Sequence, residues 1–183
     1  MEIKTKMKIE NIKKGLLRIL TPSVVVTLIY LIKYGAKISP KAEVDLSPKL
    51  KLGKGCVISS FSKVKAYDGI FEMGERGGIA TNCFIAAGEA GIKIGDNFIC
   101  GPNVSIVASN YKHDQKGVHL EDQGSTSKGI IIGNNVWVGA GCVILDGAHI
   151  ADNSIVVANS TVSRRYKPDV IIQGSPAKVI LKR

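Results

Sequence analysis

The chain has 183 residues, of which 5% are aromatic and 20 are glycine, so we expect one main domain with many tight bends. Its formal net charge is +10, and residues 1–54, with 12 Lys/Arg and 4 Asp/Glu, carry +8 of that total. Because this charge adjoins apolar sequence, it indicates contact with lipid headgroups or an acidic glycan, or else a solvated face, and we expect no nucleic-acid partner.

The cysteines form no C-x-x-C pair, which argues against a zinc ribbon or a thiol-redox motif. They are Cys56, Cys83, Cys100 and Cys142. We interpret them as small buried hydrophobic residues in a reducing compartment. The expected location is therefore the cytoplasm, with peripheral attachment to the inner face of the membrane as an option.

Two helices are predicted at the N-terminal end, in a segment that covers residues 1–36. Residues 7–20 place apolar side chains at helical spacing between lysines, which predicts a basic amphipathic helix. Thr21 and Pro22 are suited to be the N-cap and first residue of a second, apolar helix that runs to Gly35. This second helix is shorter than the ~20 residues that span a bilayer, and no signal-peptide cleavage site is evident. The sequence leaves open whether residues 7–34 pack on the following domain or lie in a membrane interface.

An aliphatic residue recurs every six positions from residue 38 onward, with imperfect steps at 50–52, 70–73 and 85–94 that we interpret as small loops at corners. The early positions are Ile38, Val44, Leu50, Leu52, Ile58, Val64, Ile70, Met73, Ile79, Ile85, Ile94, Cys100 and Ile106. The regular run follows at Ile132, Val138, Ile144, Ile150, Val156 and Val162. Helices and strands repeat at 3.6 and 2, so this spacing fits neither. Three six-residue sides close an 18-residue coil, which predicts an all-β, left-handed parallel β-helix of about six coils over residues 37–166.

One long polar segment, residues 107–131, interrupts the repeat and contains two of the three histidines. A long loop inside a regular solenoid is typical of a functional site. Pro168 is expected to end the coils, and residues 167–183 form a short tail. In that tail Val170–Ile172 predicts a last strand, and Gly174-Ser175-Pro176 a turn into a terminal basic helix or strand.

Three motifs in the second half carry a resemblance to a known family. They are IIIGNNVWVGAGCVIL after the histidine loop, VVANSTVSRR, and the terminal QGSPAKVILKR. With the repeat, they resemble the hexapeptide-repeat acyltransferases, in the sugar and polysaccharide O-acetyltransferase branch. The resemblance covers roughly residues 38–183 and implies a homotrimer that transfers an acetyl group from acetyl-CoA to a sugar hydroxyl of a cell-surface polysaccharide or its precursor.

His113 is the candidate general base. Attack by an alcohol needs a base whose pKa lies near roughly 6–7, and family members carry a histidine on or just before this loop. His119 is the second candidate for the same role. His149 ends a hexad at an outward position, so we expect no catalytic metal, which would need three protein ligands. We also expect the cysteines to be too buried to act as nucleophiles.

The resemblance assigns further roles to residues of the coils. Acetyl-CoA is expected along a groove between subunits, and the residues assigned to it are Trp137, Gly139, Ala140, Ala158, Ser163, Arg164 and Lys178. The glycine and alanines also suit tight corners irrespective of any ligand. Asn82 is the candidate acceptor contact, although Thr81 is the residue in register with the family's asparagine.

Other functions remain open at this point. The same fold serves N-acetyltransferases of nucleotide-linked amino sugars, which is the alternative enzymatic interpretation. A metal-dependent hydratase and a non-catalytic β-helix scaffold are the alternatives from other classes. The basic and apolar N-terminal segment replaces the helical segment typical of maltose and galactoside acetyltransferases, which favours a lipid-linked or polymeric acceptor over a small free sugar.

Overall fold

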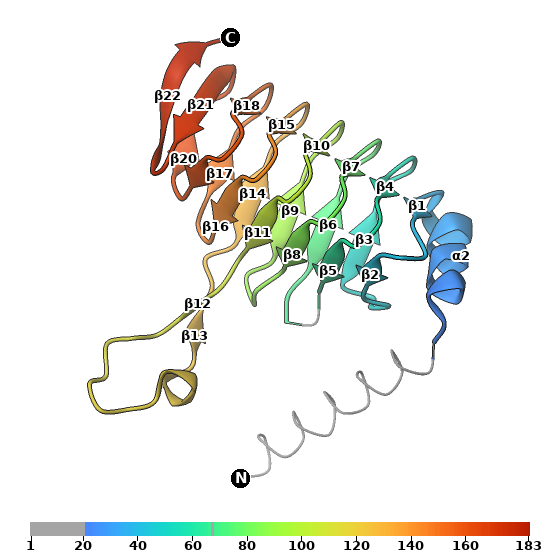
Figure 1. The fold of residues 1–183 in the computed structure, drawn as a ribbon, viewed down its shortest axis with the longest axis horizontal. Helices are drawn as coiled ribbons and strands as arrows, with labels where there is room; N and C mark the ends of the chain where they lie inside the picture. The colour runs from blue at the N-terminus through green and yellow to red at the C-terminus, as the bar shows by residue number, and fades with distance from the viewer. Residues whose placement is uncertain (1–20, 67) are drawn as a thin grey trace.

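The computed structural model describes residues 21–66 and 68–183, so the helix predicted at residues 7–20 lies outside the described residues. One helix, α2 (Ser23–Tyr34), is followed by a column of short parallel strands (Figure 1). No helix in the described part of the chain has the length and apolar character needed to cross a bilayer.

Three sheets run the length of the column, one on each side, with one strand per coil in each sheet. Sheet A contains β1 (Lys37–Ile38), β4 (Val57–Ile58), β7 (Gly78–Ile79), β10 (Ile99–Cys100), β15 (Trp137–Val138), β18 (Ile155–Val156), β21 (Val170–Gly174) and β22 (Ala177–Lys182). Sheet B contains β2 (Glu43–Val44), β5 (Lys63–Lys65), β8 (Phe84–Ala86), β11 (Ser105–Val107), β16 (Val143–Leu145) and β19 (Thr161–Val162). Sheet C contains β3 (Leu50–Leu52), β6 (Phe71–Met73), β9 (Ile92–Ile94), β14 (Ile130–Ile132), β17 (His149–Ile150) and β20 (Arg165–Tyr166).

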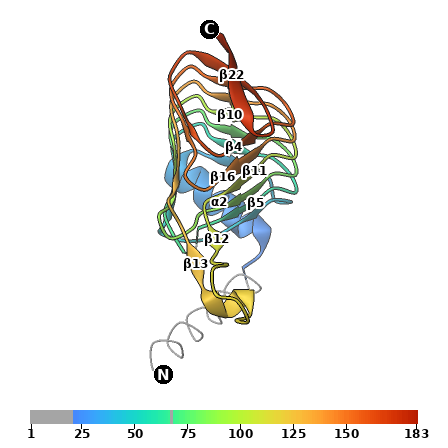
Figure 2. The ribbon, with the colours of Figure 1, turned by 90° about the vertical axis from the view of Figure 1, so that its left-hand side faces the viewer.

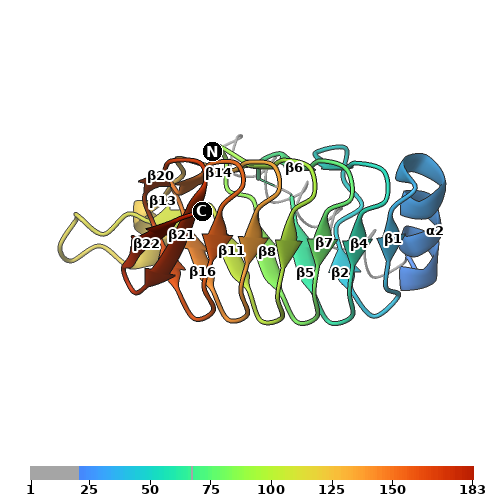
Figure 3. The ribbon, with the colours of Figure 1, turned by 90° about the horizontal axis from the view of Figure 1, so that it is seen from above.

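The chain therefore forms the predicted left-handed parallel β-helix, because sheets B and C each hold six strands and successive coils pair in parallel. Each repeat residue points inward and packs on its equivalent one coil away, as Ile106 does on Ile144. Burial of these aliphatic side chains stabilises the column by about 25 cal/mol per Å² of apolar surface. Figure 3 shows the coils as a regular row between α2 and the C-terminal hairpin.

The sequence-based register is wrong at one predicted core position. Ile70 is 48% exposed, and the fully buried Phe71 takes the inward place, stacked between Leu50 and Ile92. Several sheet C strands contribute two inward residues, so the short steps in the repeat are second core positions and not loops. A six-residue count drifts by one wherever a corner contains an insertion, as residues 66–70 do.

Helix α2 covers the first coil. The Tyr30 side chain is buried, and its hydroxyl donates a hydrogen bond of 2.8 Å to the backbone oxygen of Asp45. Gly35, with φ 63°, ends the helix in a left-handed conformation that favours glycine. The predicted N-cap was wrong: the cap residue is Pro22 and not Thr21, and no side chain caps the helix.

The C-terminal tail continues the column beyond the predicted boundary at residue 166. Strand β21 pairs in parallel with β18, so a seventh strand of sheet A follows Pro168. Strand β22 then returns antiparallel to β21, which settles the choice of helix or strand for the terminal segment in favour of a strand. The two strands form the hairpin at the end of the column opposite α2 (Figure 1).

Candidate functional site

The corners between sheets place the candidate residues, so we name them by the sheets that they join. The A–B corner includes residues 139–142 and 157–160, and the B–C corner includes residues 146–148 and 163–164. The interruption predicted at 107–131 also leaves from the B–C corner, between β11 and β14. We call residues 108–129 the arm.

The arm projects well away from the column (Figures 1 and 2). Its two limbs pair as the antiparallel strands β12 (Asn110–Tyr111) and β13 (Ser125–Thr126), and a 3₁₀ helix, η1 (Leu120–Gln123), lies near its tip. Residues 110–126 are exposed except for Gln123. The Gln123 amide accepts a hydrogen bond from the N–H of Gln115 at 3.0 Å and donates to the carbonyls of Gln115 and Val118. This amide ties the tip of the arm together, since the surrounding side chains are in solvent.

Asp146 fixes the root of the arm. Its nearly buried carboxylate accepts hydrogen bonds from the backbone N–H groups of Lys128 and Gly129 at 2.8 and 2.9 Å. The same carboxylate accepts a bond of 3.4 Å from the Asn110 amide on the outgoing limb. One side chain of the column thus holds both limbs, and sequence analysis missed it because its position is an ordinary corner of the repeat.

His113 lies on the outgoing limb. Its side chain is exposed, with Nδ1 3.3 Å from the backbone oxygen of Tyr111. An open depression of ≈ 620 Å³ surrounds it, lined also by Asn110, Tyr111, Lys112, Asp114, Thr126 and Lys128. His119, the alternative base, precedes η1 near the tip and does not line this depression. His113 therefore borders the space between the limbs, whereas the equally exposed His119 does not.

Most of the candidate CoA residues lie along sheet A and the A–B corner. Trp137 is 54% exposed on the outer face of β15, the strand that leads into Gly139 and Ala140. A Cβ on Gly139 would lie 2.5 Å from the backbone nitrogen of Ala158 in the next coil, so this position needs glycine for stacking alone. Within the described chain, the N–H groups of Ala140 and Ala158 donate no hydrogen bond. Free amides on a corner without bulky side chains fit a thin, amide-bearing chain such as pantetheine.

The remaining cofactor candidates divide between two places. Lys178 on β22 pairs with Gln173 on β21, and both strands belong to sheet A. Ser163 and Arg164 lie instead at the B–C corner, after β19. Within one chain the candidates therefore do not line a single groove.

Asn82 has a structural role at the A–B corner. Its φ of 58° is left-handed, a conformation that asparagine tolerates, and its amide donates a hydrogen bond of 2.6 Å to Asn103 one coil later. Thr81 beside it donates to the backbone oxygen of Ser60. The structure does not bring Asn82 to His113 within one chain, because the arm leaves from a different corner.

Among the described residues, the other candidate ligands and nucleophiles are dispersed or buried. No cluster of three metal-ligating side chains occurs among residues 21–66 and 68–183. All four cysteines are free and buried. A hydrogen bond from Cys100, with the two sulfurs 3.9 Å apart, lowers the pKa of Cys83 to about 7, while the hydrogen bond to Cys83 and burial raise the pKa of Cys100. Burial raises the pKa of Cys56 and Cys142.

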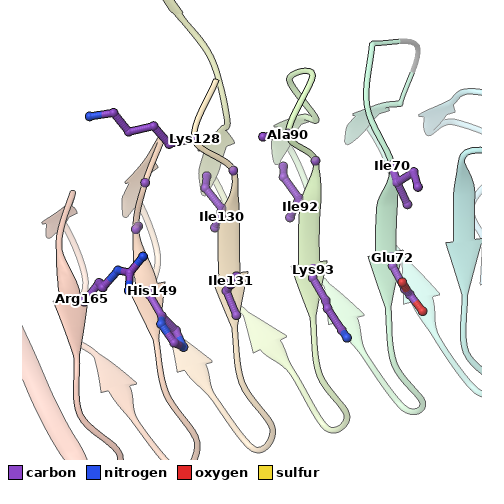
Figure 4. A pocket seen from close by; sticks show the side chains of 14 residues that line it. Ile70, Glu72, Ala90, Ile92, Lys93, Lys128, Ile130, Ile131, His149 and Arg165 are labelled. Carbon is purple, nitrogen blue, oxygen red and sulfur yellow. The ribbon is translucent and has the colours of Figure 1, made fainter. Parts of the chain in front are cut away.

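A second concave surface lies on the outer face of sheet C and has a volume of ≈ 500 Å³ (Figure 4). Glu72, Lys93, Ile131, His149 and Arg165 project from successive strands into it, as the register of β6, β9, β14, β17 and β20 requires. Lys128 lines both this groove and the depression around His113. The groove was missed at the sequence level, where only the outward position of His149 was noted.

Comparison with known proteins is consistent with this architecture. Residues 129–164 match the family description "Bacterial transferase hexapeptide (six repeats)". The chain is 38% identical over 90 residues to a galactoside O-acetyltransferase of Escherichia coli, covering 49% of this chain and 43% of the relative. It is 28% identical over 144 residues to a chloramphenicol acetyltransferase of Agrobacterium fabrum, covering 75% of this chain and 69% of the relative. The chain spans less than half the length of the galactoside enzyme that it matches.

Among solved structures, AntD, an N-acyltransferase from Bacillus cereus in complex with dTDP and 3-hydroxybutyryl-CoA, superposes with a TM-score of 0.72 at 21% identity. That match covers 81% of this chain and 80% of AntD. A maltose O-acetyltransferase from Clostridium difficile superposes with a TM-score of 0.55 at 24% identity, covering 79% and 65%. These structures establish the fold. Residues 129–164 therefore carry the hexapeptide repeat of bacterial transferases, within a chain that folds as a left-handed parallel β-helix.

Proposed function

We propose that the protein is a homotrimeric, acetyl-CoA-dependent O-acetyltransferase that modifies a sugar hydroxyl of a cell-surface polysaccharide or its precursor. The names of the relatives support acetyl transfer. Both O- and N-acyltransferases share this fold, so experiment must decide whether the acceptor atom is oxygen or nitrogen. The observation that carries the proposal concerns the two corners at either end of the sheet B strands. The arm with His113 leaves from one corner, and the candidate cofactor residues Gly139, Ala140 and Ala158 lie at the other.

Sheet B separates these two corners. The arm with His113 leaves from the B–C corner, whereas Gly139, Ala140 and Ala158 lie at the A–B corner. If three copies turn sheet B toward a threefold axis, the B–C corner of each copy meets the A–B corner of the next. The same arrangement brings Ser163 and Arg164 to the neighbour's A–B corner, beside Lys178. One subunit then supplies the base, and its neighbour supplies the flat, amide-bearing corner for the cofactor.

In this arrangement His113 performs the proton transfer. When bound, acetyl-CoA supplies an acetyl group activated as a thioester. An imidazole nitrogen of His113 accepts the acceptor hydroxyl proton as that oxygen attacks the acetyl carbonyl carbon. The new C–O bond forms, the C–S bond breaks, and the proton passes from the imidazole to the sulfur that leaves. The free backbone N–H group of Ala140, on the corner that follows the Trp137 strand, stabilises the negative charge that develops on the carbonyl oxygen.

The role of His113 is tested by thiol release from acetyl-CoA in the presence of candidate glycans and amino sugars. His113→Ala should lower turnover by about 10²–10⁴-fold with little change in acetyl-CoA affinity. His119→Ala is the matched control on the same arm and should keep most of the activity. Near-normal turnover of the His113 variant, with loss in the His119 variant, would transfer the role to His119.

The shared site is tested by mixing two inactive chains. A His113→Ala chain lacks the base and an Ala158→Trp chain blocks the cofactor corner, and each should be inactive alone while still forming trimers in sedimentation. Randomly mixed trimers should regain about a quarter of the normal sites, those formed by one intact arm and one intact corner. No recovery from mixed trimers would show that each chain builds its own site.

A second candidate function, acetyl transfer to an amine, rests on the N-acyltransferases of the same fold. AntD, an N-acyltransferase, superposes over most of the chain. Acetyl transfer to a nucleotide-linked amino sugar, faster than to any hydroxyl acceptor in the same assay, would favour this function.

A further inference from the structure

We propose that the groove on the outer face of sheet C binds the acceptor through carboxylates, so that the acceptor is an acidic glycan. This proposal rests on the proposed acetyltransferase function and names its substrate class. The groove reaches from the root of the arm to the last coil and is lined by Lys93, Lys128, His149 and Arg165, with Glu72 as its one carboxylate.

The three faces of the column differ in chemistry, and this difference distinguishes the groove. Outward residues of sheet A are mostly apolar and include the exposed Val57, Ile99 and Trp137. Those of sheet B between Phe84 and Thr161 are small or apolar. The outward residues of sheet C run Lys51, Glu72, Lys93, Ile131, His149 and Arg165. Between β6 and β20, the outward basic side chains therefore gather on sheet C.

The cations of the groove are available to a ligand. Within the described residues, Lys93, Lys128 and Arg165 form no ion pair with a carboxylate. Arg165 presents a planar guanidinium that can bind a carboxylate through two hydrogen bonds. The exposed Ile131 between Lys93 and His149 supplies an apolar surface for the face of a sugar ring.

The groove runs along the column, across successive strands, so it can hold several units of a polymeric acceptor. Adjacent strands lie about 4.8 Å apart, so Lys93 and His149, two strands apart, are separated by about 10 Å along the column. Lys128 borders both the groove and the depression around His113. A glycan in the groove would thus continue past Lys128 to the catalytic arm, where one of its hydroxyls is modified.

Calorimetry with oligogalacturonate, and with neutral maltooligosaccharide of the same length, tests the proposal on the full chain. We expect the acidic oligomer alone to bind, and Lys93→Gln with Arg165→Gln to weaken its binding about tenfold or more for each cation removed. Lys182→Gln, which removes one charge outside the groove, should leave binding unchanged. Equal binding of both oligomers, or no effect of the double variant, would overturn the proposal.

Acetyl-CoA affinity, measured on the same variants, separates this proposal from the proposed function. It should stay unchanged in the Lys93/Arg165 variant, because neither residue belongs to the A–B corner. Absence of acetyl-CoA binding in the unmodified protein would count against the acetyltransferase function, whereas normal acetyl-CoA binding without acidic-glycan binding would count against the groove alone.

A separate observation at the other end of the column concerns α2. One side of this helix packs on the first coil through Tyr30, and the opposite side exposes a stripe of aliphatic residues. These residues are Val24, Val25, Leu28, Leu31 and Ile32. Ile32 is 84% exposed, which is unusual for an aliphatic side chain with no role in contact.

We infer that this face of α2 docks on an anionic lipid surface. Residues 21–66, which form α2 and the first coils, contain eight lysines and two acidic residues, of which Asp45 is buried, so this end of the column carries a net positive charge. A helix with an exposed aliphatic face at a positively charged end of a protein can lie in the plane of an anionic interface, where burial and electrostatic attraction both contribute. At 12 residues, α2 is suited to lie on a bilayer and too short to cross it.

Co-sedimentation of the full chain with phosphatidylcholine vesicles, with or without phosphatidylserine, tests this inference. We expect binding only with phosphatidylserine, a decrease at high salt, and a loss of at least tenfold for Leu28→Gln with Ile32→Gln. The matched control is Ile180→Gln with Leu181→Gln, which removes two exposed aliphatic residues at the opposite end. Unchanged binding of the α2 variant would overturn the inference. Loss of self-association in that variant, without lipid binding by the original chain, would assign the face to a second copy.

Discussion

The column and the arm show two ways in which the same chain is held in place. In the column nearly every second residue is buried, and each coil bonds to the coils on either side. In residues 110–126 of the arm a single side chain, Gln123, is buried among exposed neighbours, and Asp146 holds the root from the column. The column is therefore stabilised by many equivalent contacts and the arm by a few specific hydrogen bonds. We expect mutations in the column to change stability and mutations in the arm to change activity.

Removal of the arm should give the largest difference between loss of activity and loss of stability. Replacing residues 112–124 by a short Gly-Ser turn is feasible because Lys112 and Gly124 are hydrogen-bonded across the limbs. Turnover should fall about 10²–10⁴-fold with the loss of His113. The melting temperature should change little, since the arm buries few side chains. For a chain of this size, each kcal/mol of lost stability lowers the melting temperature by about 2–4 °C. A fall of ~10 °C or more would therefore show that the arm is part of the folded core.

Truncation of a buried side chain in the column should instead lower stability strongly. Ile144 is fully buried between Ile106 and Val162, so Ile144→Ala should lower the free energy of unfolding by about 2–5 kcal/mol. Leu120→Ala in the arm is the matched control and should change it by at most about 0.5 kcal/mol. Urea denaturation of both variants measures the difference, and equal losses would contradict the comparison.

Asp146 joins the two regions, so its replacement should affect both. Asp146→Ala removes the acceptor from the N–H groups of Lys128 and Gly129, which should cost about 1–3 kcal/mol of stability. Turnover should fall as well, because the limbs lose their fixed root. Asp146→Asn keeps one acceptor oxygen and should lie between the alanine variant and the original protein in both measurements. Loss of stability with full activity would show that the arm positions itself without Asp146.

The smallest effect is expected at the tip of the arm. Gln123→Ala removes three hydrogen bonds of the 115–123 segment and should leave the global free energy of unfolding within about 0.5 kcal/mol. The tip itself should open more often, with amide exchange or limited proteolysis there rising about tenfold. Protection that stays unchanged in the tip would mean that η1 and the β12–β13 pair suffice to order it.

The column could be predicted from the sequence because each coil imposes the same local requirement. An aliphatic residue at every sixth position leaves few alternatives, and the structure confirms the fold. Ile70 and Phe71 show where a count of six fails: a corner insertion shifts the register, and both residues are apolar, so composition cannot choose between them. Thr21 failed as a cap for a similar reason, since both it and Pro22 suit a helix start.

The candidate site was less accessible to sequence analysis. The position of His113 on a long polar insertion could be predicted, because insertions in a solenoid are visible against its period. The roles of Asn82 and Gly139 in stacking could not, because their partners, Asn103 and Ala158, lie in the next coil. Asp146 and the groove on sheet C arise from residues brought together only when the coils are in register.

A stack of similar coils contains nothing that limits its own length, so the column needs an element that closes its end. Helix α2 is that element at the N-terminal end. The first coil would otherwise present unpaired backbone edges on three sheets, onto which another column could add. By closing that end with Tyr30 and the turn at Gly35, α2 makes the particle finite. A chain that lacks α2 would then have one newly exposed end, and its failure would appear as end-to-end pairs of columns and not as unfolding.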